Sequence, residues 1–257
     1  MTLEPERETA SCVPSPEPAA SFLLLLSALG DCVDGEAPAR QMAEHDTAGE
    51  GVGAGGVPTG RLPEGATYDF GGIRGGEVDV SGAYLNGRPD APVTVATFGD
   101  FQCVFCARSE RATAGARAQL LEEGTIRVLY LDFPLPIHAR GRPAAEFARC
   151  VGRIEGGRGF WESYRRLHRT QDRWTGAGKV EDGLRVVARE VGAEWPTVAS
   201  CMDTDAEVPT IERFQRLGGR VGVRATPTRF FNGVPRVGAI TGAQFRRMVD
   251  AVRSGQG

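Results

Sequence analysis

The pattern of apolar and polar residues divides the chain into three regions. Apolar residues are sparse before residue 77, apart from one continuous run at residues 19–30. From residue 77 onwards they recur at the spacings typical of strands and helices. The stretch between the apolar run and residue 77 is rich in Gly, Ala, Pro and Glu. It can bury too little apolar surface to offset the entropy lost on ordering. We therefore predict a leader, a flexible linker and one folded domain, over residues 1–32, 33–76 and 77–257.

The folded region opens with a strand, a helix and a second strand. Residues 93–98 (VTVATF) form a short apolar run that Gly99 ends. Residues 105–123 carry apolar positions at helical intervals, and Gly124 suits a helix C-cap. Residues 126–133 are mostly apolar, as expected of a central strand that is covered on both faces.

The second half of the folded region is mainly helical. Residues 142–222 hold several helical patterns and no strand pattern. A β-hairpin with an Asn-Gly turn and a final amphipathic helix follow, over residues 228–231, 237–240 and 241–254. This order of elements predicts an α/β fold with an inserted helical block.

The apolar run in the leader favours export from the cytoplasm. Residues 19–30 (AASFLLLLSALG) are too short for a membrane-spanning helix but have the length of the hydrophobic core of a secretory signal. A signal peptide also needs positive charge ahead of this core, whereas four glutamates outweigh Arg7 there. A disordered tail with a chance leucine cluster, or a start codon assigned too far upstream, therefore stays open as an alternative.

A cysteine directly follows the apolar run. The stretch Leu29-Gly30-Asp31-Cys32 resembles a bacterial lipoprotein cleavage site, although Asp31 departs from that pattern. A lipid anchor at Cys32 is therefore a hypothesis, and mass spectrometry of residue 32 would test it.

Composition and charge exclude several classes of protein. The chain is 41% hydrophobic and 25% charged, which is ordinary for a soluble globular protein. The net charge of −3 conceals an acidic N-terminal part, since the first 60 residues hold ten acidic residues against two arginines. Basic residues after Arg61 are scattered along amphipathic segments and do not form one stripe, so we predict no binding to nucleic acid.

The candidate chemistry lies in a Cys-x-x-Cys motif where the first strand gives way to the first helix. At a helix start, unpaired N–H groups and the positive end of the dipole favour a thiolate on Cys103. Cys106 lies one turn further on and can resolve a mixed disulfide by attacking Cys103. Half a zinc site is an alternative, but the sequence has no second such motif or spaced histidine pair to complete it. Two unreactive structural cysteines are a second alternative.

A proline at the entrance to the predicted hairpin adds a second site element. Pro227 lacks an N–H and is tolerated only at a strand start or in an unusual turn. Together with the cysteine motif it resembles the thioredoxin superfamily, in which a cis-proline loop lies against the two cysteines. That resemblance implies that Thr226 and Pro227 bind the substrate chain.

The sequence resembles one branch of that superfamily more closely, the DsbA-like thiol-disulfide oxidoreductases. The resemblance covers roughly residues 82–254 and includes the inserted helical block. The stretches that carry it, in order, are Asp90-Ala91-Pro92-Val93, Phe98 to Cys103, Asp132-Phe133-Pro134-Leu135 with His138, Gly159-Phe160-Trp161 and Thr226-Pro227-Thr228. It implies a thioredoxin-like fold without a cofactor, protein thiol or disulfide substrates, and a separate redox partner in the membrane.

Several positions depart from that family. Val104 and Phe105 replace the proline and histidine that members often have between the cysteines, so the redox potential stays open. Thr97 stands where some relatives have a buried carboxylate, and Asp100 is a candidate substitute. For His138 we favour a structural role, with hydrogen bonds to the backbone, over a role near the active site.

Two further cysteines fall within the helical block. Similar proteins can carry a second disulfide there, which implies that Cys150 pairs with Cys201. Such a bridge would close a loop of about 50 residues and stabilise the fold by about 4 kcal/mol. Two separate buried thiols are the alternative.

The sequence therefore predicts an exported thiol-disulfide oxidoreductase, with Cys103 as the attacking group and Cys106 as the resolving group. The alternative from another class is a non-catalytic module of the same fold that binds a metal or a client. All four methionines lie far from the motif in sequence, so no additional soft ligand is evident. A glutathione-dependent enzyme is disfavoured, because such enzymes usually do not need the second cysteine.

Overall fold

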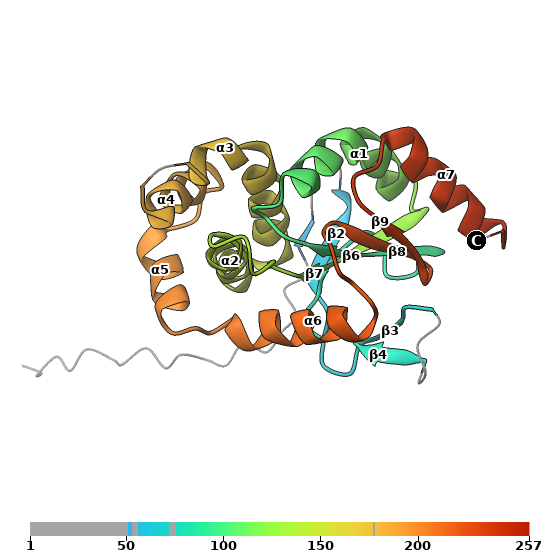
Figure 1. Cartoon of the computed structure of the whole chain (residues 1–257), viewed down its shortest axis with the longest axis horizontal. Helices are drawn as coiled ribbons and strands as arrows, with labels where there is room; N and C mark the ends of the chain where they lie inside the picture. The colour runs from blue at the N-terminus through green and yellow to red at the C-terminus, as the bar shows by residue number, and fades with distance from the viewer. Residues whose placement is uncertain (1–50, 53–55, 72–75, 177, 257) are drawn as a thin grey trace, which may run out of the picture. The chain divides into compact units, whose positions relative to one another are not determined.

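The computed structural model describes residues 51–52, 56–71, 76–176 and 178–256 (Figure 1). These residues belong to one compact unit, Asp46–Gly257. The predicted leader, with Cys32 and the hypothetical lipid anchor, lies outside the described residues. No described helix is both long enough and apolar enough to cross a membrane.

The core of the fold is a mixed sheet in the order β1-β2-β5-β7-β6-β8-β9. The two central strands, β6 and β7, are parallel, and every other pairing in the sheet is antiparallel. The strands are β1 Gly51–Val52, β2 Pro58–Arg61, β5 Tyr84–Asn86, β6 Val93–Gly99, β7 Ile126–Asp132, β8 Thr228–Phe231 and β9 Val234–Val237. A separate antiparallel pair is formed by β3 Thr67–Asp69 and β4 Glu77–Asp79.

Helices cover both faces of the sheet. Successive side chains of a strand point to opposite faces, and β6 has apolar side chains on both. Val95 packs in a core cluster with residues of α7, whereas Phe98 packs in a second cluster with residues of α6. Figure 1 shows α1 beside α7 on one side of the sheet and α6 on the other. The bounds are α1 Val104–Glu122, α6 Val208–Arg220 and α7 Gly242–Arg253.

The remaining helices form the inserted block between β7 and α6. They are α2 Gly141–Arg169, α3 Gln171–Trp174, α4 Val180–Glu190 and α5 Trp195–Asp203. A disulfide between Cys150 and Cys201 joins α2 to α5. The predicted order of strand, helix, strand, helical block, hairpin and final helix is confirmed.

A buried arginine ties the block to the sheet. Arg149 of α2 donates to Asp132 at the end of β7 and to Glu207 just before α6, each at 2.9 Å. All three side chains are fully buried. Burial raises the pKa of Asp132 to about 6, although the Arg149 charge opposes this change. The cluster fixes three segments that are distant in sequence at one point.

The structure differs from the predicted linker over residues 56–71. This stretch contributes β2, which pairs with β5, and β3, which pairs with β4. The physical reason is tertiary contact: a Cβ on Gly157 of α2 would lie only 2.5 Å from the backbone nitrogen of Gly60. The glycine therefore lets a helix cover β2, although β2 itself carries few apolar residues.

The second strand of the hairpin also differs from its predicted position. It begins at Val234, directly after the two-residue Asn232-Gly233 turn, and not at Val237. Both turn residues have positive φ values of 44° and 87°, a conformation that asparagine and glycine tolerate best. The tight turn thus sets the register of β9.

Candidate active site

Cys103 and Cys106 lie at the start of α1. Cys103 is the N-cap residue, with an extended backbone, and Cys106 lies in the first helical turn. Both are free thiols in the structure, and each side chain is almost fully buried. Because the first N–H groups of a helix have no partner within it, they are available to a thiolate on the N-cap residue.

The loop before β8 lies against the first cysteine. The peptide bond between Thr226 and Pro227 is cis. The carbonyl oxygen of Thr226 accepts a hydrogen bond from Cys103 Sγ at 3.3 Å, across 123 positions of sequence. The fold thus brings together the four residues that the sequence singled out as catalytic or substrate-binding.

The environment of Cys103 favours its thiolate. A hydrogen bond from the Cys106 thiol is the largest cause that lowers the pKa of Cys103, to about 5. Thr226 and the N–H groups of Phe105 and Cys106 lower it further, and burial opposes them. The Thr226 hydroxyl is buried and has no partner while the Cys103 thiol donates to the Thr226 carbonyl. That hydroxyl is therefore free to donate to the thiolate.

Cys106 has the opposite tendency. Burial is the main cause that raises its pKa well above the ordinary thiol value, and its hydrogen bond to Cys103 adds to this. At neutral pH the reduced pair therefore holds a Cys103 thiolate next to a protonated Cys106. A low pKa on the first sulfur makes it both a ready nucleophile and a good leaving group.

The turn ahead of Cys103 is held by a buried carboxylate. Asp100 accepts hydrogen bonds from the N–H groups of Gln102 and Leu135, both at 2.8 Å. Its Oδ2 atom also lies 2.5 Å from Nδ1 of His138. His138 therefore contacts a carboxylate beside the active-site turn, and not the backbone partner that the sequence analysis favoured.

Gln171 is a site residue that sequence reasoning missed. Its side-chain amide donates to the carbonyl oxygens of Phe101, at 2.7 Å, and Cys103, at 3.1 Å. Gln171 opens α3, so the helical block holds the active-site turn directly. A lone glutamine in a helical region gives no sequence signal for this role.

Arg229 is the second missed residue. It is buried, lies two positions after Pro227, and pairs in register with Thr97. Its guanidinium donates to the Ser109 hydroxyl at 3.0 Å, one helical turn beyond Cys106. No carboxylate in the described ranges forms an ion pair with Arg229. Where some relatives are expected to have a buried negative charge, this chain therefore has Thr97 beside a buried positive charge.

A buried ion pair lies further along α1. Burial opposes ionisation of Glu110, but the charge and hydrogen bonds of Arg117 outweigh it and lower the pKa of Glu110 to about 2. The Tyr164 hydroxyl donates to the same carboxylate at 2.8 Å. Burial lowers the pKa of nearby His168 to about 4, so this imidazole is neutral at pH 7.

Acidic and metal-binding side chains do not cluster at the site. In the portion of the chain that the structure covers, no three His, Cys, Asp or Glu side chains are arranged to hold a metal ion. The disulfide-bonded Cys150 and Cys201 lie in the helical block, separate from the Cys103 and Cys106 pair in sequence and in bonding.

A family model described as thioredoxin matches residues 80–251. The chain belongs to the thioredoxin family. Two curated proteins are similar to this chain in sequence. Disulfide bond formation protein D of Bacillus subtilis is 24% identical over 162 residues, which cover 61% of this chain and 71% of that protein. The Na(+)/H(+) antiporter NhaA 1 of Mycolicibacterium gilvum is 29% identical over 192 residues and matches 68% of this chain, which spans only 27% of the antiporter.

Solved structures of thioredoxin-like proteins have the same fold. The α-DsbA1 protein of Wolbachia pipientis has a TM-score of 0.61 at 18% identity, covering 70% of this chain and 94% of its own. BdbD of Bacillus subtilis has a TM-score of 0.59 at 20% identity, covering 66% of this chain and 92% of its own. The predicted thioredoxin-like fold and the resemblance to DsbA-like proteins are confirmed.

Proposed function

We propose that this thioredoxin-family protein exchanges disulfides with protein substrates through Cys103 and Cys106. The observation that carries the proposal is the asymmetry of the two sulfurs. Cys103 is the helix N-cap, has a pKa of about 5 and faces the Thr226 carbonyl, whereas Cys106 is buried with a raised pKa. Such a pair suits an attacking sulfur and a resolving sulfur.

The proposed direction is oxidation of substrate thiols. In the oxidised protein, a substrate thiolate attacks Cys103 Sγ, the bond between the two cysteines breaks, and Cys106 leaves as a thiolate that takes up a proton. A second thiolate of the substrate then attacks the substrate sulfur of the mixed disulfide. This step forms the substrate disulfide and releases Cys103 as a thiolate. The substrate loses two electrons and the protein gains them. A stabilised Cys103 thiolate favours the reduced protein and hence this direction.

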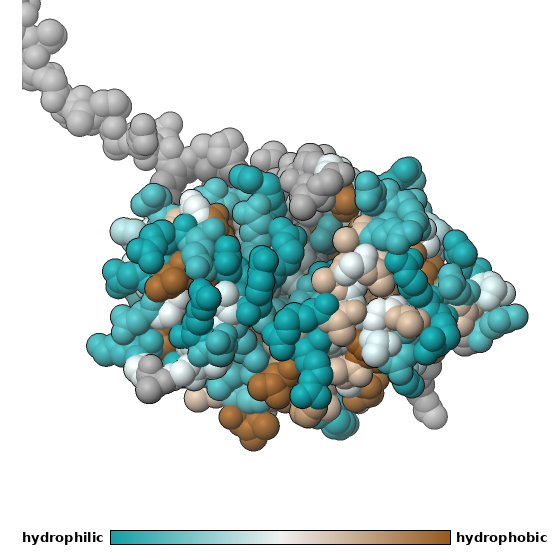
Figure 2. Space-filling view, turned by 90° about the horizontal axis from the view of Figure 1, so that it is seen from above, coloured by the Kyte–Doolittle hydropathy of each residue, from teal (hydrophilic) through white to brown (hydrophobic). Residues whose placement is uncertain are grey.

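Exposed apolar side chains surround the site and support a polypeptide substrate. Val104 and Phe105, between the cysteines, are 60% and 52% exposed. Ile137 is 82% exposed, next to His138, which contacts the active-site turn. Val237 is 61% exposed and pairs with Thr228, directly after Pro227. The surface seen in Figure 2 is mostly hydrophilic with a few hydrophobic patches. Exposed apolar residues around one site therefore favour a binding surface for a polypeptide.

We propose that the reaction takes place outside the cytoplasm and that a membrane protein carrying a disulfide reoxidises Cys103 and Cys106. Two observations support this location. The chain holds a disulfide in its helical block, and disulfides persist mainly in oxidising compartments. The relatives with similar sequences include a protein named for disulfide bond formation.

The test is oxidative refolding of a reduced, unfolded substrate protein by the oxidised full-length chain. We expect stoichiometric formation of substrate disulfides by the wild type and none above background by Cys103→Ser. Cys12→Ser/Cys32→Ser, which alters the two cysteines outside the described residues, is the matched control and should retain the full rate. Equal rates for the wild type and Cys103→Ser would refute the assignment.

A further inference from the structure

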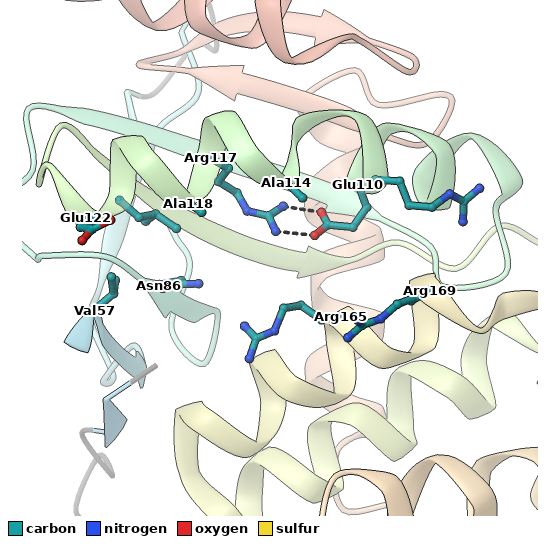
Figure 3. A pocket seen from close by; sticks show the side chains of 11 residues that line it. Val57, Asn86, Glu110, Ala114, Arg117, Ala118, Glu122, Arg165 and Arg169 are labelled. Atoms are coloured by element: carbon teal, nitrogen blue, oxygen red, sulfur yellow. Dashed lines mark hydrogen bonds and ion pairs between the residues drawn. The ribbon is translucent and has the colours of Figure 1, made fainter. Parts of the chain in front are cut away.

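A pocket of about 580 Å³ lies along α1, beyond the active-site cysteines. Its walls come from α1, from the C-terminal part of α2 and from the region of β2 and β5 (Figure 3). The first lining residue on α1, Glu110, comes four positions after Cys106. A pocket of this volume is in the range of small-molecule sites, and the proposed disulfide exchange does not use it.

The pocket contains more positive charge than its own carboxylates can neutralise. Four arginines and two glutamates line it. Arg117 is neutralised by its ion pair with Glu110. Arg165 and Arg169 of α2 form no ion pair with any carboxylate of the described residues. Two guanidinium groups of one wall are therefore left without an anion.

The position of Arg165 makes this imbalance significant. Figure 3 shows its guanidinium in the space between α1 and α2, on the same side as the amide of Asn86. Burial is the main cause that lowers the pKa of Arg165. The charges of Glu162 and Glu110 oppose this change, and repulsion by Arg117 and Arg169 adds to it. A bound oxyanion would relieve this repulsion and would accept hydrogen bonds from a planar donor group that suits it.

The rest of the lining is aliphatic. Ala114, Ala118 and Leu121 of α1 and Val57 beside β2 line the pocket, and no aromatic ring does so among the described residues. The two alanines leave room that a longer side chain would fill. The pocket thus combines an unneutralised cationic centre with a small apolar wall.

We propose that this pocket binds a free amphipathic carboxylate, with its head on Arg165 and its aliphatic chain along Ala114, Ala118, Leu121 and Val57. The site does not depend on the redox reaction. A fatty acid of medium length has both the single oxyanion and the flexible aliphatic body that the lining calls for.

The test is titration of the full-length protein with decanoate by isothermal titration calorimetry. We expect one decanoate per chain, and an increase in Kd of about tenfold or more for Arg165→Gln, because a hydrogen bond to a charged group contributes about 1.5–3 kcal/mol. Ala118→Trp, at an exposed position, should abolish binding by filling the pocket. Arg220→Gln, at an exposed arginine outside the pocket, should bind like the wild type.

Further probes separate the proposal from its rivals. Decanol and acetate, which each carry only half of the proposed chemistry, should bind much more weakly than decanoate. Cys103→Ser should bind decanoate unchanged, so failure of the proposed redox function would leave this result intact. Absence of decanoate binding, equal affinities for the wild type and Arg165→Gln, or binding only to vesicles of phosphatidylglycerol would each overturn the proposal.

Discussion

Replacing Cys106 tests which group makes Cys103 acidic. The pKa of Cys103 is lowered from 9.0 to about 5, which corresponds to about 5 kcal/mol in favour of its thiolate. The Cys106 thiol is the largest cause. A hydrogen bond to a charged group contributes about 1.5–3 kcal/mol, so Cys106→Ala should lower the ionisation constant of Cys103 about 10- to 100-fold. Cys106→Ser keeps a donor of similar size and should largely preserve the low pKa.

The assay is the rate of alkylation of Cys103 by iodoacetamide as a function of pH. A Cys12→Ser/Cys32→Ser background leaves Cys103 as the reactive thiol, because Cys150 and Cys201 are held in a disulfide and burial raises the pKa of the Cys106 thiol. We expect half-maximal reactivity near pH 5 with Cys106 present, and at clearly higher pH in Cys106→Ala.

Two outcomes would refute this reasoning. If Cys106→Ala reacts with the same pH dependence as the wild type, the helix N-terminus and Thr226 alone set the pKa of Cys103. If Cys106→Ser shifts the profile as far as Cys106→Ala does, packing around the second cysteine matters and its hydrogen bond does not.

Four further predictions concern the active-site pair, a buried arginine, a buried ion pair and the disulfide of the helical block. The reduction potential of the Cys103 and Cys106 pair should fall by about 30 mV per pH unit above pH 5 and by about twice that below pH 5. The reason is that Cys106 binds a proton on reduction throughout this range, whereas Cys103 binds one only below its pKa of about 5. A single slope from pH 4 to 7 in a glutathione-buffered titration would contradict this. Arg229→Met should prolong the lifetime of a mixed disulfide between Cys103 and a peptide about tenfold, because a nearby positive charge favours the Cys106 thiolate that resolves this disulfide. Arg229→Lys keeps the charge and should resolve the mixed disulfide at the wild-type rate. Equal lifetimes for the wild type and Arg229→Met would show that the charge has no such effect. Glu110 has a folded pKa of about 2, below its unfolded value, so its contribution of about 3 kcal/mol is present above pH 4.5 and lost as the pH falls towards 2; urea unfolding across that range should show a shallower loss of stability in Glu110→Gln. Cys150→Ala/Cys201→Ala opens a bridge between residues 51 positions apart and should lower the free energy of unfolding by about 4 kcal/mol without changing the exchange rate, and an unchanged urea midpoint would argue against a stabilising role.

Local sequence signals predicted the central elements well. The runs that became β6 and β7 are mostly apolar, and the run that became α1 has helical periodicity. Glycines end the first strand and the helix, and each observed element lies within one residue of its prediction. β2 and β5 escaped prediction for a physical reason. They are short, and their order comes from pairing with each other and with β7 and from contact with Gly157 of α2, which no local pattern reveals.

The candidate site divides in the same way. The cysteine motif and the Thr226-Pro227 loop are recognisable in sequence because each has unusual local chemistry. Gln171 and Arg229 are not, since their roles depend on contacts 68 and 120 positions away in the chain. Their residue types are common in helices and on strand surfaces, so only the fold shows that they face the active-site helix.

The bridge between α2 and α5 has a consequence for how the protein matures. A newly made chain carries Cys150 and Cys201 as thiols, and Cys150 becomes completely inaccessible once the helical block has closed over it. An oxidant can therefore reach Cys150 directly only before folding is complete. Under the proposed activity, a finished molecule can supply that oxidation to its unfinished sister, which makes each nascent copy a client of those made before it.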